Sequence, residues 1–240
     1  MAGFVDLHCH YLAGVDDGAR DASESVLMLQ GLAGLGFELV IATPHMRPGL
    51  FDNEKAQLES AFAVMNPVFE RPDLPRTALS SEHYFDDVMF DRIRRGCGLP
   101  YPGGRAILLE FYEIDFPSAV DRCFADLRRG GLLPVIAHPE RYRCLWRSLD
   151  ALERLIDGGA AALLDVAAFD GKYGQRPRET AEKILQRELY HAACSDAHRP
   201  SDVASVKRGM NWIAARYGAE EVDFLFGEGP RALLDGRLPA

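Results

Sequence analysis

The stretch FVDLHCHYLAGVDDG, residues 4–18, joins an apolar run to two histidines, a cysteine and a pair of acids. Side chains alternate between the two faces of an extended strand, so His8 and His10 share one face while Cys9 points to the other. Two imidazoles on one face are typical of a metal site, and the acids of the following turn can supply a further ligand. Cys9 is expected to pack beneath the helices rather than act as a nucleophile.

Six more apolar runs of strand length follow. They are FELVIATPH (37–45), RTALSSEHY (76–84), RAILLEF (105–111), LLPVIAHPE (132–140), AALLDVA (161–167) and YHAACSDAH (190–198). Segments of helical pattern separate most of them, at 22–35, 53–66, 117–130, 148–158, 177–188 and 201–217. This alternation predicts an α/β fold with parallel strands and crossover helices that cover the sheet. The chain has no repeat or linker, so residues 1–240 are expected to form a single domain.

Polar side chains recur at the C-terminal ends of the runs. They are His8 and His10, His45, Glu82, Glu110, His138, Asp165, and Asp196 with His198. Successive ones are 27 to 37 residues apart, about the length of one strand–helix unit. Because the parallel strands of a barrel end at the same mouth, seven such units predict that these side chains face one another. Asp165 is expected to lie outside the ligand set, either as a hydrogen-bonding group behind the others or as a helix N-cap.

Nine side chains are candidate metal ligands. They are His8, His10, His45, Glu82, Glu110, His138, Asp196, His198 and one acid of the VDDG turn, Asp16 or Asp17. One ion takes about four to six ligands, so this set predicts two or three ions that share a bridging carboxylate. Clustered acids without cations would raise each other's pKa. Imidazole mixed with carboxylate favours Mn, Fe(II), Zn or Co over a pure Mg site.

A cluster of such ions can generate hydroxide near neutral pH and hold the oxygens of a phosphoryl group. The ligand set therefore favours hydrolysis of a phosphate ester. Arg141, three residues after His138, is expected to bind the remaining phosphate oxygens. Arg47 and Arg199 are weaker candidates on neighbouring loops. The segment CFADLRR (123–129) has the C-x5-R spacing of cysteine-dependent phosphatases, but it lacks glycine and is predicted to be helical.

The composition argues against several classes of protein. A net charge of −9 disfavours a nucleic-acid-binding surface. The sequence lacks a run long enough for membrane insertion and a signal-peptide pattern. Five cysteines without a CxxC pair indicate a reduced, cytoplasmic protein. The oligomeric state stays open.

Six blocks of this sequence resemble the PHP (polymerase and histidinol phosphatase) superfamily. More narrowly, they are similar to the bacterial PHP-type protein-tyrosine phosphatases of capsule and exopolysaccharide operons. The blocks are DLHCHYLAGVDDGARD (6–21), ATPHMRPG (42–49), SSEHYFDD (80–87), LLEF (108–111), PVIAHPERY (134–142) and CSDAH (194–198). They run in order over most of the chain, and the narrower similarity rests mainly on GVDDG and HPERY.

The resemblance implies a distorted (β/α)7 TIM-like barrel with three divalent metal ions, often manganese, with Fe, Zn, Co and Mg as alternatives. The implied grouping is His8, His10, Glu82 and Asp196 on one ion, Glu82, Glu110 and His138 on a second, and His45, His198 and Asp17 on the third. Asp17 is favoured over Asp16. Arg141 matches a family arginine that binds the substrate phosphate, and the family's second such arginine has no match, which leaves Arg47, Arg199 and Arg208 as candidates.

The implied activity is hydrolysis of phosphotyrosine on protein. The implied partner is the tail of a bacterial tyrosine autokinase that controls polysaccharide synthesis. Two alternatives stay open: a small-molecule phosphatase of the histidinol-phosphatase kind, and a catalytically silent PHP barrel used as a binding module. The filled ligand positions disfavour the silent module.

Overall fold

The computed structural model describes residues 3–239, whose strands form two parallel sheets. The strands are β1 (Phe4–Cys9), β2 (Phe37–Ala42), β3 (His45–Met46), β4 (Arg76–Leu79), β5 (Glu82–Tyr84), β6 (Ala106–Glu110), β7 (Leu133–Ala137), β8 (Ala161–Asp165) and β9 (Ala192–Cys194). The sheet orders are β1-β2-β4 and β3-β5-β6-β7-β8-β9. Each predicted run contains a strand, but residues 37–45 and 76–84 are each divided into two short strands.

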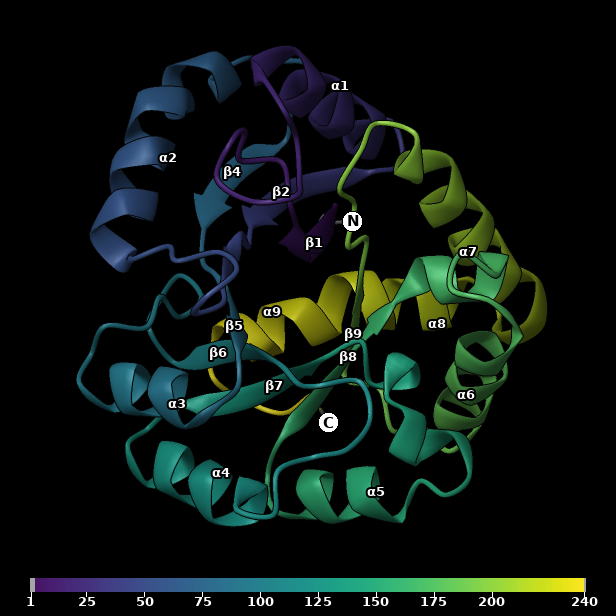
Figure 1. Cartoon of the computed structure of the whole chain (residues 1–240). Helices are drawn as coiled ribbons and strands as arrows, with labels where there is room; N and C mark the ends of the chain where they lie inside the picture. Colours follow the sequence, from purple (N-terminus) through teal and green to yellow (C-terminus); the bar gives the residue numbers. More distant parts are fainter. Residues whose placement is uncertain (1–2, 240) are drawn as a thin grey trace.

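Backbone hydrogen bonds join the two sheets into a distorted barrel. Where the second and third runs divide, Ser80 N–H donates to the Ala42 carbonyl at 2.8 Å and Glu82 N–H to the Pro44 carbonyl at 3.2 Å, so the pairing of these runs continues from one sheet into the other. On the other side, His10 N–H donates to the Ala197 carbonyl at 2.9 Å and so connects the end of β1 to the segment after β9. Figure 1 shows the strands gathered inside a ring of helices, with α9 crossing behind them. The predicted α/β fold with parallel strands is confirmed.

The helices cover the outside of the strands. They are α1 (Ala22–Ala33), α2 (Lys55–Phe69), α3 (Asp87–Arg94), α4 (Val120–Arg129), α5 (Asp150–Asp157), α6 (Gln175–Gln186), α7 (Asp202–Tyr217), α8 (Ala219–Asp223) and α9 (Gly229–Leu234). Short helical turns add η1 (Pro139–Arg141), η2 (Arg143–Trp146), η3 (Val166–Asp170) and η4 (Phe224–Glu228). The six predicted helices correspond to α1, α2 and α4 to α7. The sequence reading missed α3, which is short and begins where the Asp86 side chain accepts the Met89 N–H.

Two apolar layers hold the strands in place. Side chains such as Leu108 and Val135 belong to one buried cluster, whereas Leu109 and Ile136, their neighbours along the strands, belong to the other, which extends to the helices. Cys9 is fully buried in the helix-side cluster, as predicted. No helix within residues 3–239 combines the length and apolar character needed to cross a membrane.

Candidate metal centre

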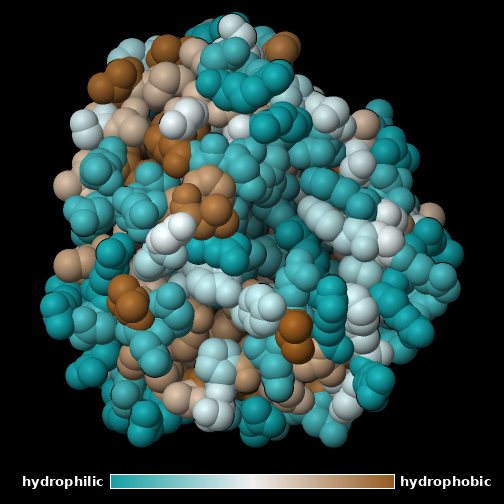
Figure 2. All heavy atoms as spheres, viewed as in Figure 1, coloured by the Kyte–Doolittle hydropathy of each residue, from teal (hydrophilic) through white to brown (hydrophobic). Residues whose placement is uncertain are grey.

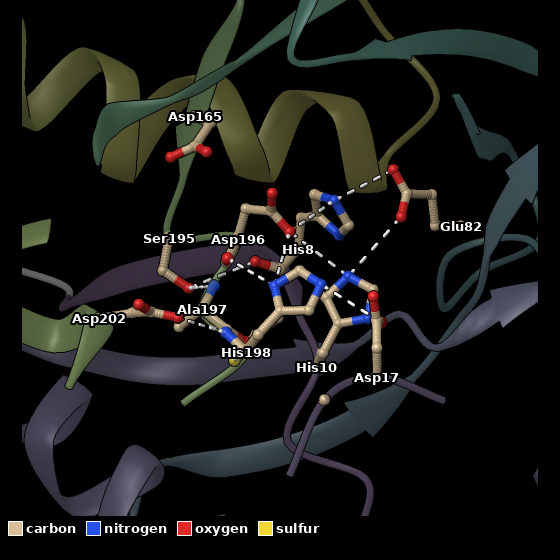
Figure 3. A network of polar contacts seen from close by, with 12 residues as sticks. His8, His10, Asp17, Glu82, Asp165, Ser195, Asp196, Ala197, His198 and Asp202 are labelled. Atoms are coloured by element: carbon tan, nitrogen blue, oxygen red, sulfur yellow. Dashed lines mark hydrogen bonds and ion pairs between the residues drawn. The ribbon is translucent and has the colours of Figure 1, made fainter. Parts of the chain in front are cut away.

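The period of the strands decides which side chains reach the mouth of the barrel. Glu110 follows the buried Leu108 at a spacing of two, and Asp196 follows the buried Cys194 in the same way. Both carboxylates therefore continue the inner face of their strands beyond the apolar layer. Figure 3 shows His8, Asp196 and His198 close together, with Asp165 apart from them.

Two of the predicted ligands have strained backbones. His138 comes directly after β7 with φ of 33°, and Asp196 comes two residues after β9 with φ of 41°. Residues other than glycine seldom adopt positive φ, and such strain concentrates at functional sites. The sharp bends let each side chain turn into the barrel mouth at the point where its strand ends.

The structure brings all nine predicted ligands together. Ligand atoms within 4.8 Å of one another form four groups: His10, Asp17, His45 and His198; His8, His10 and Glu82; His8, His138 and Asp196; His45, Glu82 and Glu110. The grouping that the resemblance implies is kept for Asp17, His45 and His198. Glu110 lies with Glu82, as the resemblance implies, and His45 joins them. His138 groups with His8 and Asp196, but its Nε2 also lies 2.8 Å from Glu82 Oε1, so its implied contact with Glu82 is present as well.

The two acids of the VDDG turn have different positions. Asp17 Oδ1 lies 3.4 Å from His45 Nε2 and 3.5 Å from His198 Nε2, within the cluster. Asp16 instead lies behind His10, whose Nδ1 is 2.8 Å from Asp16 Oδ2. Gly18 makes this turn tight, because a Cβ there would lie 2.1 Å from the His10 carbonyl oxygen. The geometry thus favours Asp17 as the ligand and Asp16 as a support for His10.

Sequence reasoning missed one further support. Thr43 Oγ1 lies 2.5 Å from His8 Nδ1 and also accepts the Cys9 N–H at 3.1 Å. Such contacts to the outer nitrogen of a histidine fix its ring, so that the other nitrogen faces the metal. The position of Thr43 two residues before His45, at the same strand end, was the available signal.

The charges of the cluster depend on one another. Burial and the neighbouring Glu82 raise the pKa of Glu110 to about 7. Burial opposes ionisation of Glu82, but His8 and His45 hold its pKa well below the usual range. Burial also opposes protonation of His45, yet Glu82 and Asp17 raise its pKa to about 12. The carboxylates compete for positive charge, which divalent cations would supply.

Unpaired polar atoms provide a second test of whether metal ions fit. Five buried atoms of the candidate ligands make no hydrogen bond within residues 3–239: His8 Nε2, His10 Nε2, Glu110 Oε2, His138 Nδ1 and Asp196 Oδ1. His45 Nδ1 makes none of good geometry either, but it lies 2.9 Å from Glu82 Oε2 as an ion pair. Buried polar groups are nearly always paired, because an unpaired one costs about 1–3 kcal/mol. Imidazole nitrogens and carboxylate oxygens are also the donor atoms that Mn, Fe or Zn ions bind. The residues present therefore fit bound divalent metal ions.

Arg141 lies beside this cluster in a fixed position. Its Nη2 donates to Asp165 Oδ2 at 2.6 Å, to the Tyr173 hydroxyl at 3.1 Å, and to Asp196. The guanidinium also stacks on the Tyr173 ring, 4.0 Å from its centroid. Asp165 thus has the predicted hydrogen-bonding role, and it also caps η3, because its Oδ1 accepts the Ala167 N–H at 2.9 Å. No local motif indicated Tyr173, which is 32 residues away along the chain.

The other candidate arginines differ in their surroundings. Arg47 lines the same cavity as Arg141. Arg199 donates to the carbonyls of Gly18 and His198. Arg208 is on α7 and pairs with Asp170. Of the three, Arg47 alone lines the cavity.

The cluster opens into a cavity of about 230 Å³. Its lining residues are Asp17, His45, Arg47, Leu50, Phe51, Glu82, Glu110, His138, Arg141, Asp196 and His198. Figure 2, which views the molecule in the same direction as Figure 1, shows a hydrophilic hollow near the middle of this face. A cavity of this size suits a phosphate group and part of the group that it esterifies.

The fold and the site define an α/β-barrel protein with a metal-type centre at the C-terminal ends of its strands. Residues 4–235 match the family described as capsular polysaccharide synthesis, CpsB/CapC. The chain belongs to this family, and the resemblance drawn from the sequence is confirmed.

Several relatives have established names. The chain is 32% identical over 232 residues to the tyrosine-protein phosphatase YwqE of Bacillus subtilis, covering 96% of this chain and 91% of that protein. It is 25% identical to the tyrosine-protein phosphatase CpsB of Streptococcus pneumoniae, over 98% of this chain and 99% of that protein. A solved structure from the work on YwqE and CpsB, described as unique metal-dependent tyrosine phosphatases, superposes with a TM-score of 0.89 at 27% identity, covering 98% of this chain and 96% of the other.

Proposed function

We propose that this chain is a metal-dependent phosphatase that hydrolyses phosphotyrosine on protein. One observation carries the proposal: nine ligand-type side chains cluster beside Arg141 at the mouth of the barrel. The substrate class is supported by the relatives, which are named tyrosine-protein phosphatases. We further propose that residues 1–240 act as one metallophosphatase domain.

The proposed cofactor is a set of three divalent ions, with Mn²⁺ as the first choice. The proposed ligands are His8, His10, Asp17, His45, Glu82, Glu110, His138, Asp196 and His198. When bound, the ions supply a hydroxide nucleophile near neutral pH and neutralise charge on the phosphoryl oxygens. The mixed imidazole and carboxylate donors support Mn, Fe, Zn or Co more than Mg.

The chain's own residues orient the substrate and the ligands. Arg141 lines the cavity and its side chain is 19% exposed, so a phosphate bound in the cavity can reach the guanidinium. Asp165 and Tyr173 hold the guanidinium in place, which lowers the entropy lost when phosphate binds. Asp16 and Thr43 fix the rings of His10 and His8. Glu82 and Asp196 are each 1% exposed, whereas the side chains of His198 and Asp17 are 23% and 54% exposed, so the cluster has a buried floor and a side that is open to solvent and substrate.

The expected protein substrate is the tyrosine-phosphorylated tail of a bacterial kinase that controls capsule or exopolysaccharide synthesis. The family's link to capsular polysaccharide synthesis supports this partner. We place the activity in the cytoplasm, where thiols stay reduced, because all five cysteines are free.

The proposal is tested by phosphate release from a phosphotyrosine peptide, histidinol phosphate and a nucleotide diester, each with Mn²⁺ and with chelator. We expect Mn²⁺-dependent turnover of the peptide above the other two substrates. Preference for histidinol phosphate would favour the small-molecule alternative. Absence of turnover with every metal tested, despite metal binding, would favour the silent binding module. Turnover that survives chelation would overturn the metal mechanism.

A further inference from the structure

The lining of the catalytic cavity divides into two parts. Eight of its residues are candidate ligands or Arg141, all ionisable. The other three, Arg47, Leu50 and Phe51, come from the single segment between β3 and α2. The two apolar side chains of the cavity therefore lie next to each other in sequence, while the rest of its lining is charged or titratable.

This segment, residues 47–51, is held in a defined shape. Arg47 N–H donates to the Phe51 carbonyl at 3.0 Å, and Phe51 N–H donates back to the Arg47 carbonyl at 2.8 Å. Gly49 permits the tight turn between them with φ of 81°. The Arg47 guanidinium stacks on the Tyr84 ring, 4.1 Å from its centroid, and so ties the segment to β5. An ordered segment of this kind presents its side chains without a large entropy cost on binding.

The two apolar side chains have different environments. The Phe51 ring stacks almost parallel to the His45 ring, with centroids 5.3 Å apart and an interplanar angle of 8°. Leu50 is 60% exposed. An exposed leucine is ordinary by itself, but this one lines a cavity whose other walls bind charge. Its apolar surface is available to the group attached to the phosphate.

We propose that Leu50 and Phe51 form a wall that receives the aromatic ring of an aryl phosphate. This inference rests on the proposed function and adds the origin of substrate preference. An aryl ring buries apolar surface against the wall, whereas the short polar chain of phosphoserine does not. The wall, and not the ligand cluster, sets the preference for phosphotyrosine. Arg47 acts as a positioning residue that fixes the segment.

The test is calorimetric binding of phenylphosphonate and of inorganic phosphate to the Mn²⁺-loaded protein and its Leu50→Ser variant. Phenylphosphonate carries the aryl ring, whereas inorganic phosphate probes the ligand cluster and Arg141 alone. We expect the Kd of phenylphosphonate to rise roughly tenfold in Leu50→Ser, as for loss of an apolar pocket contact. The Kd of inorganic phosphate should stay within about twofold, because the wall makes no contact that it needs.

Leu27→Ser is the matched control. Leu27 is 55% exposed on α1 and does not line the cavity, so both Kd values should stay at the parent's. If Leu50→Ser changes the Kd of both ligands equally, or changes neither Kd, the proposed aryl-binding wall is wrong. Turnover of a phosphotyrosine peptide is measured in parallel for the parent and for Leu50→Ser. If the peptide is turned over equally well by both proteins, the proposed wall is wrong and the proposed function stands. If phenylphosphonate binding depends on Leu50 but the parent shows no turnover, the wall is supported and the phosphatase assignment is wrong.

Discussion

Substitution of Asp16 by asparagine tests whether Asp16 supports the His10 ring or is itself a metal ligand. The Asp16 carboxylate receives three N–H donors: Oδ2 faces His10 Nδ1 at 2.8 Å and the His45 N–H at 3.0 Å, and Oδ1 accepts the Gly18 N–H at 2.8 Å. An asparagine of the same size keeps only one acceptor oxygen. Its NH₂ group must then face an N–H group, so at least one hydrogen bond is lost together with the negative charge.

The size of the effect follows from these contacts. Loss of a hydrogen bond to a charged group costs about 1.5–3 kcal/mol. Because a 1.4 kcal/mol difference is about tenfold in an equilibrium constant, we expect Mn²⁺ affinity to fall about ten- to a hundredfold. His10 stays in the cluster, so saturating Mn²⁺ should restore kcat to within about threefold of the parent. Asp17→Asn takes the negative charge from a ligand of the cluster itself, and excess Mn²⁺ should not restore that activity.

The assay combines Mn²⁺ titration of the metal-free protein by calorimetry with turnover of a phosphotyrosine peptide across Mn²⁺ concentrations. Asp223→Asn serves as the control, because Asp223 is exposed on α8 and its loss changes net charge alone. Parental Mn²⁺ affinity in Asp16→Asn would refute the supporting role. If excess Mn²⁺ rescues Asp17→Asn but not Asp16→Asn, the two assignments must be exchanged.

Three other expectations address Arg141, the thiols and acid stability. Arg141→Lys should lower kcat/KM for the peptide about a hundredfold, since lysine cannot make the bidentate contact with phosphate. Unchanged Mn²⁺ binding in this variant would show that the loss does not come from a displaced Asp196. Cys123→Ser should leave kcat/KM unchanged while chelator abolishes it, because Cys123 is buried within α4 and does not line the cavity; loss of turnover in this variant would revive a thiol mechanism. Burial holds the pKa of His191 at about 4, below the unfolded value of about 6.5. The unfolded state therefore binds the extra proton, and the free energy of unfolding should fall as pH drops from about 6.5 to about 4. His191→Gln should reduce this fall in the free energy of unfolding by up to about 3 kcal/mol. Urea denaturation at several pH values measures it, and the same pH dependence in the parent and the variant would show that His191 is not its source.

The sequence by itself determined the order of strands and helices and the residues at the strand ends. Alternating apolar runs and helical segments specify parallel strands, and period two puts His8 and His10 on one face of β1. The helices that it missed, such as α3, are short, and an isolated helix of that length has little preference of its own.

Only the tertiary structure decided which side chains share a contact. It separates Asp16 from Asp17, which are adjacent in sequence, because the turn at Gly18 aims one at His10 Nδ1 and the other at His45. It also brings Tyr173 onto Arg141 from a different strand–helix unit. Local sequence reports periodicity and residue type, but distances across the barrel mouth depend on how seven runs close into one ring, and those distances determine the chemistry of the site.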